Sequence, residues 1–289
     1  MTRRERWIPY AFLLPAFIGL LLFQLIPIIF GLGRSLYGVN FTSGTGLVQF
    51  VGLKNFQDLF SDPVFWNAFR VTLVFNLFVN PIQVVLALGI AVLLNAKLRG
   101  IGFFRTLFYM PIGVSLTVTT VIWGLLLDRD SGLVNGVLNA LGIQSQAFLQ
   151  SPGQALPSLI LLLSWKGIAF WTLILLAGLQ SVSPTLYEAA EVDGASDWQR
   201  FWGITLPLMR RPLAYVLISA TVGNFLLFIP VQILTKGGPQ GSTSVLMYEA
   251  FRSGFIGIDM GRATAITSVL FVFVAALVAL QSWILREKS

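Results

Sequence analysis

Residues 71–94 read VTLVFNLFVNPIQVVLALGIAVLL and contain no charged side chain. A helix needs about 20 mostly apolar residues to cross the hydrocarbon core of a bilayer, so this stretch is long enough to span a membrane. The sequence therefore predicts an all-α, polytopic membrane protein. Five further predominantly apolar stretches bring the expected number of transmembrane helices to six, and they cover residues 7–33, 103–127, 156–179, 213–234 and 263–285.

The composition supports this fold class. Of the 289 residues 56% are hydrophobic and 11% are charged, and the mean hydropathy is +0.80. A soluble domain is typically about 45–50% apolar and about 25% charged, so soluble, disordered and collagen-like classes are excluded. The chain has neither cysteine nor histidine, which removes the commonest nucleophiles, bases and metal ligands. We expect no catalytic residue, no metal site and, despite the net charge of +7, no nucleic-acid partner.

The basic residues predict the orientation. Lysine and arginine are denser in one set of loops, and the denser set is predicted to be cytoplasmic. Both termini then lie inside, and the polar segments are too short for a separate domain, so residues 1–289 should form a single transmembrane domain. The basic residues of the denser set are Arg3, Arg4, Arg6, Lys97, Arg99, Arg105, Arg200, Arg210, Arg211, Arg286 and Lys288.

The sequence contains neither of the usual patterns for driving a membrane process, by an ion gradient or by ATP. All twelve acidic residues fall in loops or at span ends, whereas an ion-coupled carrier usually needs a carboxylate inside the membrane. An ion-coupled or facilitative carrier is therefore the weaker alternative. The absence of paired intramembrane acids also argues against a membrane-embedded hydrolase. No G-x-x-x-x-G-K-[ST] phosphate loop occurs, so ATP must be bound by another protein.

Residues 181–212, SVSPTLYEAAEVDGASDWQRFWGITLPLMRRP, form the most informative loop. Ser183 and Pro184 predict the start of a helix, and Gly194 predicts its left-handed end. Ser196 and Gln199 form a capping-box pattern that opens a second short helix, with Pro207 beyond it. The loop should consist of two short helices around a glycine bend.

Two interpretations of this loop compete. An amphipathic segment could lie on the membrane surface with Trp198, Phe201 and Trp202 inserted. The loop also carries four acids on an otherwise basic cytoplasmic face, which favours a protein partner over anionic lipid. The four acids are Glu188, Glu191, Asp193 and Asp197.

The same loop carries a resemblance. Its residues match the full EAA signature, and the chain resembles the membrane subunits of binding-protein-dependent ABC importers. The resemblance implies that the loop forms coupling helices that dock on an ATPase subunit. The coupling residues it implies are Glu188, Ala189, Ala190, Asp193, Gly194, Ile204, Leu206 and Pro207.

Other segments are similar to the carbohydrate-uptake branch of this family. They are residues 132–143 (GLVNGVLNALGI), the pair Phe148-Leu149 and residues 234–244 (LTKGGPQGSTS), the last resembling the first permease of maltose- and glycerol-phosphate-type systems. The chain lacks the extra N-terminal spans and the large periplasmic insertion of the maltose-type first permease. Properties of the maltose-type first permease that depend on those regions therefore cannot be assigned to this chain.

The resemblance implies a function and a set of partners. The chain should be the permease subunit, not an enzyme, of an importer that moves a sugar, polyol or glycerol-phosphate-like solute inward. It should pair with a second, homologous permease as a heterodimer. An ATPase dimer carrying ATP and Mg should bind the cytoplasmic face, and a solute-binding protein the outer face. The chain itself would bind no cofactor and would lie in the cytoplasmic (inner) membrane of a bacterium or archaeon.

Lys166 is the only charged residue deep within a predicted span. It lies about ten residues, or about 15 Å, from the outer end of its span, which exceeds the reach of a lysine, so a functional role is favoured over snorkelling. It would suit an anionic solute, hydroxyl groups or a helix C-terminus. By resemblance, two helical faces line the translocation path, and their residues are Leu163, Lys166, Gly167 and Phe170, and Ala220, Gly223, Asn224 and Leu227.

Two of these residues offer specific chemistry. Phe170 could stack on a sugar ring. Asn224 could bind solute as donor and acceptor, or it could make a hydrogen bond between helices, an equally strong interpretation. Weaker candidates with the same alternative are Asn76, Asn80 and Gln83.

Overall fold

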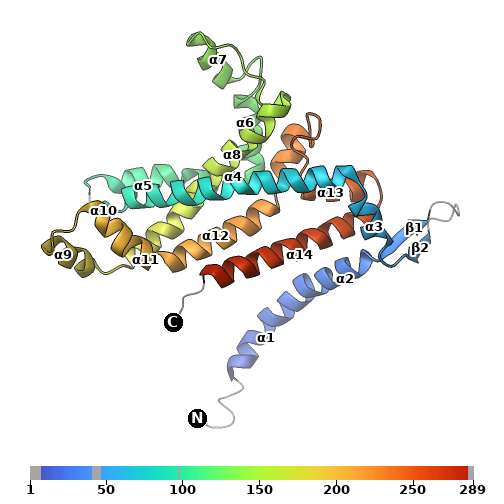
Figure 1. Ribbon diagram of the computed structural model, residues 1–289, viewed down its shortest axis with the longest axis horizontal. Coiled ribbons are helices and arrows are strands. Elements are labelled where there is room, and N and C mark those ends of the chain that lie inside the picture. The colour runs from blue at the N-terminus through green and yellow to red at the C-terminus, as the bar shows by residue number, and fades with distance from the viewer. Residues whose placement is uncertain (1–7, 41–46, 97, 286–289) are drawn as a thin grey trace. The chain divides into compact units, whose positions relative to one another are not determined.

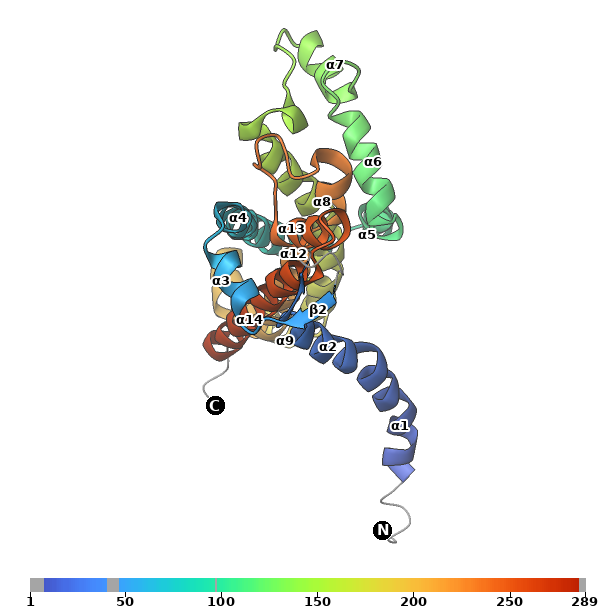
Figure 2. The same cartoon turned by 90° about the vertical axis from the view of Figure 1, so that its right-hand side faces the viewer.

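The computed structural model describes residues 8–40, 47–96 and 98–285, and most of them are helical (Figures 1 and 2). The chain divides into two compact units. The first comprises Met1–Phe65 and Glu249–Val272, and the second comprises Trp66–Tyr248 and Phe273–Ser289. Helices α4 and α14 each run through both units. The expected single transmembrane domain stays a prediction.

The first unit begins with a long apolar helix. Helix α1 (Ile8–Leu20), a π-helical turn (Leu21–Leu25) and helix α2 (Ile26–Arg34) follow one another without a break. An antiparallel hairpin of β1 (Tyr37–Asn40) and β2 (Leu47–Phe50) comes next, followed by helix α3 (Lys54–Phe60). The prediction of an all-α fold was therefore incomplete, because it did not include this hairpin. A side chain from α3 holds the hairpin in place. Asn55 donates from Nδ2 to the carbonyls of Ser35, at 2.7 Å, and Tyr37, at 3.0 Å.

Helix α4 (Pro63–Leu94) begins eight residues before the predicted span. Asp62 accepts a hydrogen bond from the Val64 amide, at 2.8 Å, and Pro63 occupies the first turn, which together form a strong helix start. Asp62 also pairs with Arg262 near the start of helix α14 (Met260–Leu285). Burial raises the pKa of Asp62, but these two contacts outweigh it and hold the pKa below its usual value.

The second unit is a bundle of long and short helices. Besides most of α4 and the end of α14, it contains eight labelled helices: α5 (Ile101–Tyr109), α6 (Leu116–Leu126), α7 (Leu133–Ala140), α8 (Pro152–Gln180), α9 (Pro184–Val192), α10 (Asp197–Arg200), α11 (Leu206–Leu208) and α12 (Arg210–Phe225). The short helix α13 (Leu246–Phe251) lies at the boundary between the units. Helix α6 packs against α8, where the ring centroids of Trp123 and Trp165 are 5.8 Å apart, and α7 lies beyond it at the top of both views (Figures 1 and 2).

Two apolar clusters hold α4, α8 and the segment after α11 together. One joins the first halves of α4 and α8 to residues 227–248, with Phe75, Leu159 and Val231 at its centre. The other joins the second halves of α4 and α8 to the start of α12. At Gly178 a Cβ atom would lie 2.8 Å from Pro212 Cγ, so the small residue permits close approach of α8 and α12.

Two of the six predicted spans are not continuous α-helices in the structure. Within the described residues, four helices are long and apolar enough to cross a membrane, namely Phe12–Arg34, Pro63–Leu94, Pro152–Gln180 and Met260–Leu285. The predicted span 103–127 is a pair of helices, Ile101–Gly113 and Leu116–Leu126, bent by 98°. The predicted span 213–234 is interrupted at residues 226–228, after α12 ends. Six crossings and cytoplasmic termini therefore stay predictions.

Candidate functional site

Helix α9 carries the first half of the EAA signature and ends at a left-handed glycine. Gly194 has φ +81°. The Ala195 amide donates to the Ala190 carbonyl at 2.9 Å, and the Gly194 amide donates to the Glu191 carbonyl at 3.0 Å. This is the Schellman pattern of hydrogen bonds, which satisfies the last carbonyls of a helix. The predicted glycine bend is confirmed.

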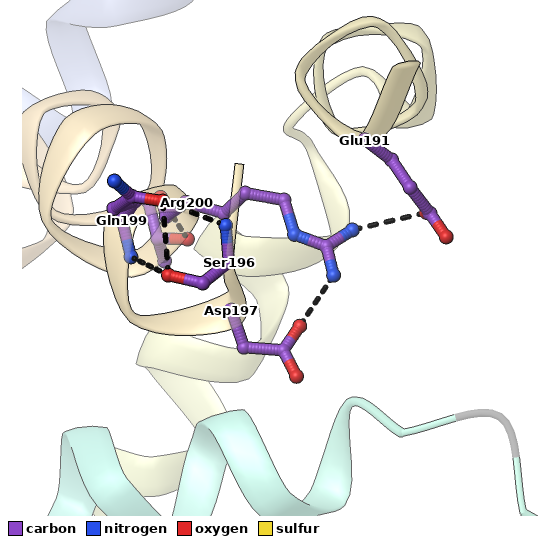
Figure 3. Close-up of polar contacts among 6 residues, drawn as sticks. Glu191, Ser196, Asp197, Gln199 and Arg200 are labelled. Carbon is purple, nitrogen blue, oxygen red and sulfur yellow. Dashed lines mark hydrogen bonds and ion pairs between the residues drawn. The ribbon is translucent and has the colours of Figure 1, made fainter. Parts of the chain in front are cut away.

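The capping box at the start of α10 is also confirmed (Figure 3). The Gln199 amide donates to Ser196 Oγ at 3.3 Å, and the Ser196 amide donates to Gln199 Oε1 at 2.8 Å. Pro207 lies beyond this helix, as predicted, but the helical path does not stop at Arg200. A π-helical turn, Phe201–Thr205, continues α10 into α11, which contains Pro207. The wider turn gives the proline ring room that a regular α-helical turn would not.

Arg200 clasps the two short helices together (Figure 3). Its Nη1 lies 3.1 Å from Glu191 Oε2 on α9, and its Nη2 pairs with Asp197 on α10. The Arg200 side chain is 20% exposed, whereas that of Glu191 is 72% exposed. The hydroxyl groups of Tyr187 and Thr205, 3.0 Å apart, form a second link. This clasp could not be predicted from the sequence, because a nine-residue separation across a bend has no periodic signal.

The signature residues are accessible to a partner. Glu188, Ala189, Asp193, Gly194 and Pro207 are exposed. Partly buried are Ala190, Ile204 and Leu206. In the part of the chain that the structure describes, no hydrogen bond or ion pair engages the Glu188 carboxylate. Docking of an ATPase on this surface stays a prediction that the exposure favours.

Lys166 lies at the bend between α5 and α6. Its ammonium group donates to the carbonyls of Pro111 and Val114, which flank the 98° break. The Val114 amide also donates to the Pro111 carbonyl, at 3.4 Å, and the lysine, which can supply up to three donors, adds a bond to each of the two carbonyls. Of the partners that the sequence left open, the structure shows carbonyls at the end of a helical segment. A contact between Lys166 and solute stays a prediction.

A hydrogen-bonded network of buried and partly buried amide side chains connects α4, α8 and α12. Gln83 donates from Nε2 to the Leu163 carbonyl at 2.8 Å, and its Oε1 accepts from Trp171 Nε1 at 3.2 Å and from Asn224 Nδ2 at 2.9 Å. Asn224 also donates to Asn80 Oδ1 at 2.7 Å. The interpretation of Asn224 as a link between helices is therefore confirmed. The hydrogen-bonded network continues along α4 from Asn80 to Asn76 and on to the Thr72 carbonyl.

The remaining candidate path residues divide into exposed and buried positions. Phe170 and Gly223 are exposed, whereas Leu163, Ala220 and Leu227 are buried in this chain. A Cβ atom at Gly167 would overlap the Gln83 amide, so this glycine makes room for the hydrogen-bonded network. Gln83 therefore packs against Gly167 on α8 and accepts a hydrogen bond from Asn224 on α12. Their place in a translocation path stays a prediction.

Gln83→Leu should destabilise the folded protein. The substitution removes the acceptor of Trp171 Nε1 and one of the two acceptors of Asn224 Nδ2, at about 1–3 kcal/mol for a buried donor left unsatisfied. Each kcal/mol should lower the thermal midpoint by about 2–4 °C in a protein of this size class. The measurement is thermal unfolding of the purified protein. Ser164→Ala is the matched control, because Ser164 Oγ is buried without a hydrogen-bond partner in the described structure. Equal midpoints for Gln83→Leu and wild type would contradict the prediction.

Comparisons with known proteins agree with these features. Residues 63–288 match the family model described as "Binding-protein-dependent transport system inner membrane component". The chain is 35% identical to the sn-glycerol-3-phosphate transport system permease protein UgpA of Yersinia pestis, over 98% of this chain and 95% of the relative. It is 35% identical to the trehalose/maltose transport system permease protein MalF of Thermococcus litoralis, over 94% and 91% of the two chains.

A solved structure shows the same fold. One chain of a bacterial alginate ABC transporter, in complex with an alginate pentasaccharide-bound periplasmic protein, matches with a TM-score of 0.81 and 28% identity. The match covers 98% of this chain and 95% of that chain. Together with the EAA loop, these matches establish that the chain belongs to the family of binding-protein-dependent transport system inner membrane components.

Proposed function

We propose that this chain is the permease subunit of an ATP-driven importer for a sugar, polyol or glycerol-phosphate-like solute. Its relatives are transport components and not enzymes, and they serve sn-glycerol-3-phosphate, trehalose or maltose. The observation that carries the proposal is the EAA loop, in which two short helices around a glycine bend present an exposed acidic surface. A separate ATPase dimer with ATP and Mg would dock there. This chain would bind no cofactor.

A second permease would complete the pathway. Helix α6 carries an exposed apolar stripe at helical spacing, formed by Val118, Val121, Ile122 and Leu125. The 98° bend turns this helix out of line with α5, which suits contact with a homologous permease in a heterodimer. A solute-binding protein would deliver solute at the outer face. The complex would lie in the cytoplasmic (inner) membrane of a bacterium or archaeon.

Reconstitution tests the function. The chain, its partner permease, the ATPase subunit and the solute-binding protein are placed in proteoliposomes, and uptake of labelled maltose and of glycerol 3-phosphate is measured. We expect uptake of at least one solute to require internal ATP and the external binding protein. Ionophores that collapse ion gradients should leave this uptake unchanged. Gradient-driven uptake by this chain without the ATPase would instead support the carrier alternative.

The orientation has its own test. A reporter fused at Arg200 should read as cytoplasmic, and reporters near Asp130 and Gln240 should read as periplasmic. A fusion at Lys97, which lies outside the described residues, should also be cytoplasmic. The reason is the higher density of basic residues in that set of loops. A periplasmic signal at Arg200 would separate the EAA loop from any cytosolic ATPase and would overturn the docking proposal.

A further inference from the structure

An aromatic cluster projects from the second half of the EAA loop. Trp198 and Trp202 are 69% and 52% exposed. Their ring centroids lie 5.6 Å apart in an edge-to-face arrangement, and Phe201 packs against both. Two large, exposed indole rings on one helical face are unusual on a surface that contacts only water, because their burial is strongly favourable.

The Arg200 clasp determines where this cluster faces. Successive helical residues are rotated by about 100°, so Trp198 and Trp202 each lie about 200° around the axis from Arg200. Arg200 points to Glu191 on α9. The two tryptophans therefore project from the side of α10 that is turned away from α9. The exposed acids of α9 and the aromatic cluster occupy different sides of the loop.

The charges on the two sides differ as well. On α9, Glu188 and Asp193 are exposed acids. The one acid of α10, Asp197, lies only about 60° around the axis from Arg200 and pairs with it, so it belongs to the side that faces α9. Continuing along the helical segment, the next charged residues are Arg210 and Arg211, both exposed at the start of α12. Tryptophan followed by arginine along a helix near the end of a membrane bundle is the combination typical of the headgroup region.

We propose that Trp198 and Trp202 form a lipid-contact surface that seats the α10–α11 segment in the headgroup region of the bilayer. Phospholipid is the occupant because the cluster is continuous with α12, which packs against the long apolar helix α8, and because Arg210 and Arg211 follow it along the same helical segment. The surface anchors one side of the EAA loop, while the acidic side remains available to a protein. The inference rests on the proposed function only in placing the ATPase on that acidic side.

Single cysteines provide the test, because the chain contains none of its own. Trp198→Cys and Trp202→Cys, each labelled with a fluorophore, are assembled into the full complex with cysteine-free partner subunits in nanodiscs of mixed zwitterionic and anionic phospholipid. Quenching by a nitroxide on the lipid is compared with quenching by aqueous iodide. We expect the lipid-borne quencher to be at least twofold more effective at both positions. Val192→Cys on α9, where the side chain is 88% exposed, is the matched control and should be insensitive to the lipid quencher.

Each other outcome overturns the inference. Quenching by iodide alone means that the cluster faces water, and quenching by neither agent means that protein covers it. If a cysteine variant does not assemble, cross-linking of the unaltered complex by a photoactivatable phospholipid gives a second readout. Lipid adducts should then appear on the tryptic peptide 201–210, and their absence would contradict the inference. ATP hydrolysis stimulated by the binding protein, measured on the same nanodiscs, tests the proposed function separately.

Discussion

Gly194→Asp should release or uncouple the ATPase subunit while the membrane fold stays intact. A Cβ atom at this position meets nothing within 4 Å, so no side chain in the chain is displaced. The backbone is the constraint, because at φ +81° a residue other than glycine costs about 1–2 kcal/mol. The Asp side chain also adds charge and bulk at an exposed bend that must approach a partner closely. We expect at least a tenfold loss of both bound ATPase and uptake.

The measurement is purification of the complex through a tag on this chain, followed by quantification of the ATPase subunit and of solute uptake. Gly142→Asp is the matched control. Gly142 also has a positive φ, of +77°, and open space around its Cβ position, but it follows α7 in a loop predicted to be periplasmic. It should carry the same local strain and retain the ATPase. Wild-type recovery and uptake in Gly194→Asp would refute the coupling-helix assignment.

Lys166→Met should abolish most transport of every solute without preventing assembly. Methionine keeps much of the length of the side chain but removes the donors to the Pro111 and Val114 carbonyls. Hydrogen bonds from a charged group contribute about 1.5–3 kcal/mol each. Without them, the angle between α5 and α6 should no longer be fixed. We expect more than a tenfold fall in uptake and in ATP hydrolysis stimulated by the binding protein.

A comparison of solutes separates two roles for this lysine. If Lys166 fixes the bend, Lys166→Met should impair uptake of a neutral sugar and of a glycerol phosphate equally, and Lys166→Arg should restore part of both. If the ammonium group contacts an anionic solute, only the phosphorylated one should be lost. Wild-type uptake of both solutes in Lys166→Met would show that the lysine is dispensable.

Local chemistry explains why the EAA loop was predictable. Its helix start, its glycine bend and its capping box each depend on residues within a few positions of one another, so Ser183, Gly194 and Ser196 were sufficient to locate them. The main departure, continuation of the helix through Pro207, required a π-helical turn that residue preferences do not encode.

The breaks in two spans could not be predicted in this way. Apolar content continues through residues 103–127 and 213–234, and hydropathy does not distinguish a straight helix from a bent one. The first break is stabilised by Lys166, 55 residues from Pro111 in sequence. After the second break, Leu227 turns into a core with Val231 and Val245. Similarly, Asn224 could be identified as a candidate, but its partner Asn80 lies 144 residues away.

The amide of Gln83 has a consequence for how such a transporter moves. This one side chain is bonded to α8 through Leu163 and Trp171 and to α12 through Asn224. Sliding any of the three helices past the others would break several of these hydrogen bonds at once, which is costly for groups removed from water. Alternating access is therefore expected to proceed by rocking of α4, α8 and α12 as one rigid body, with the shear confined to the surfaces around them.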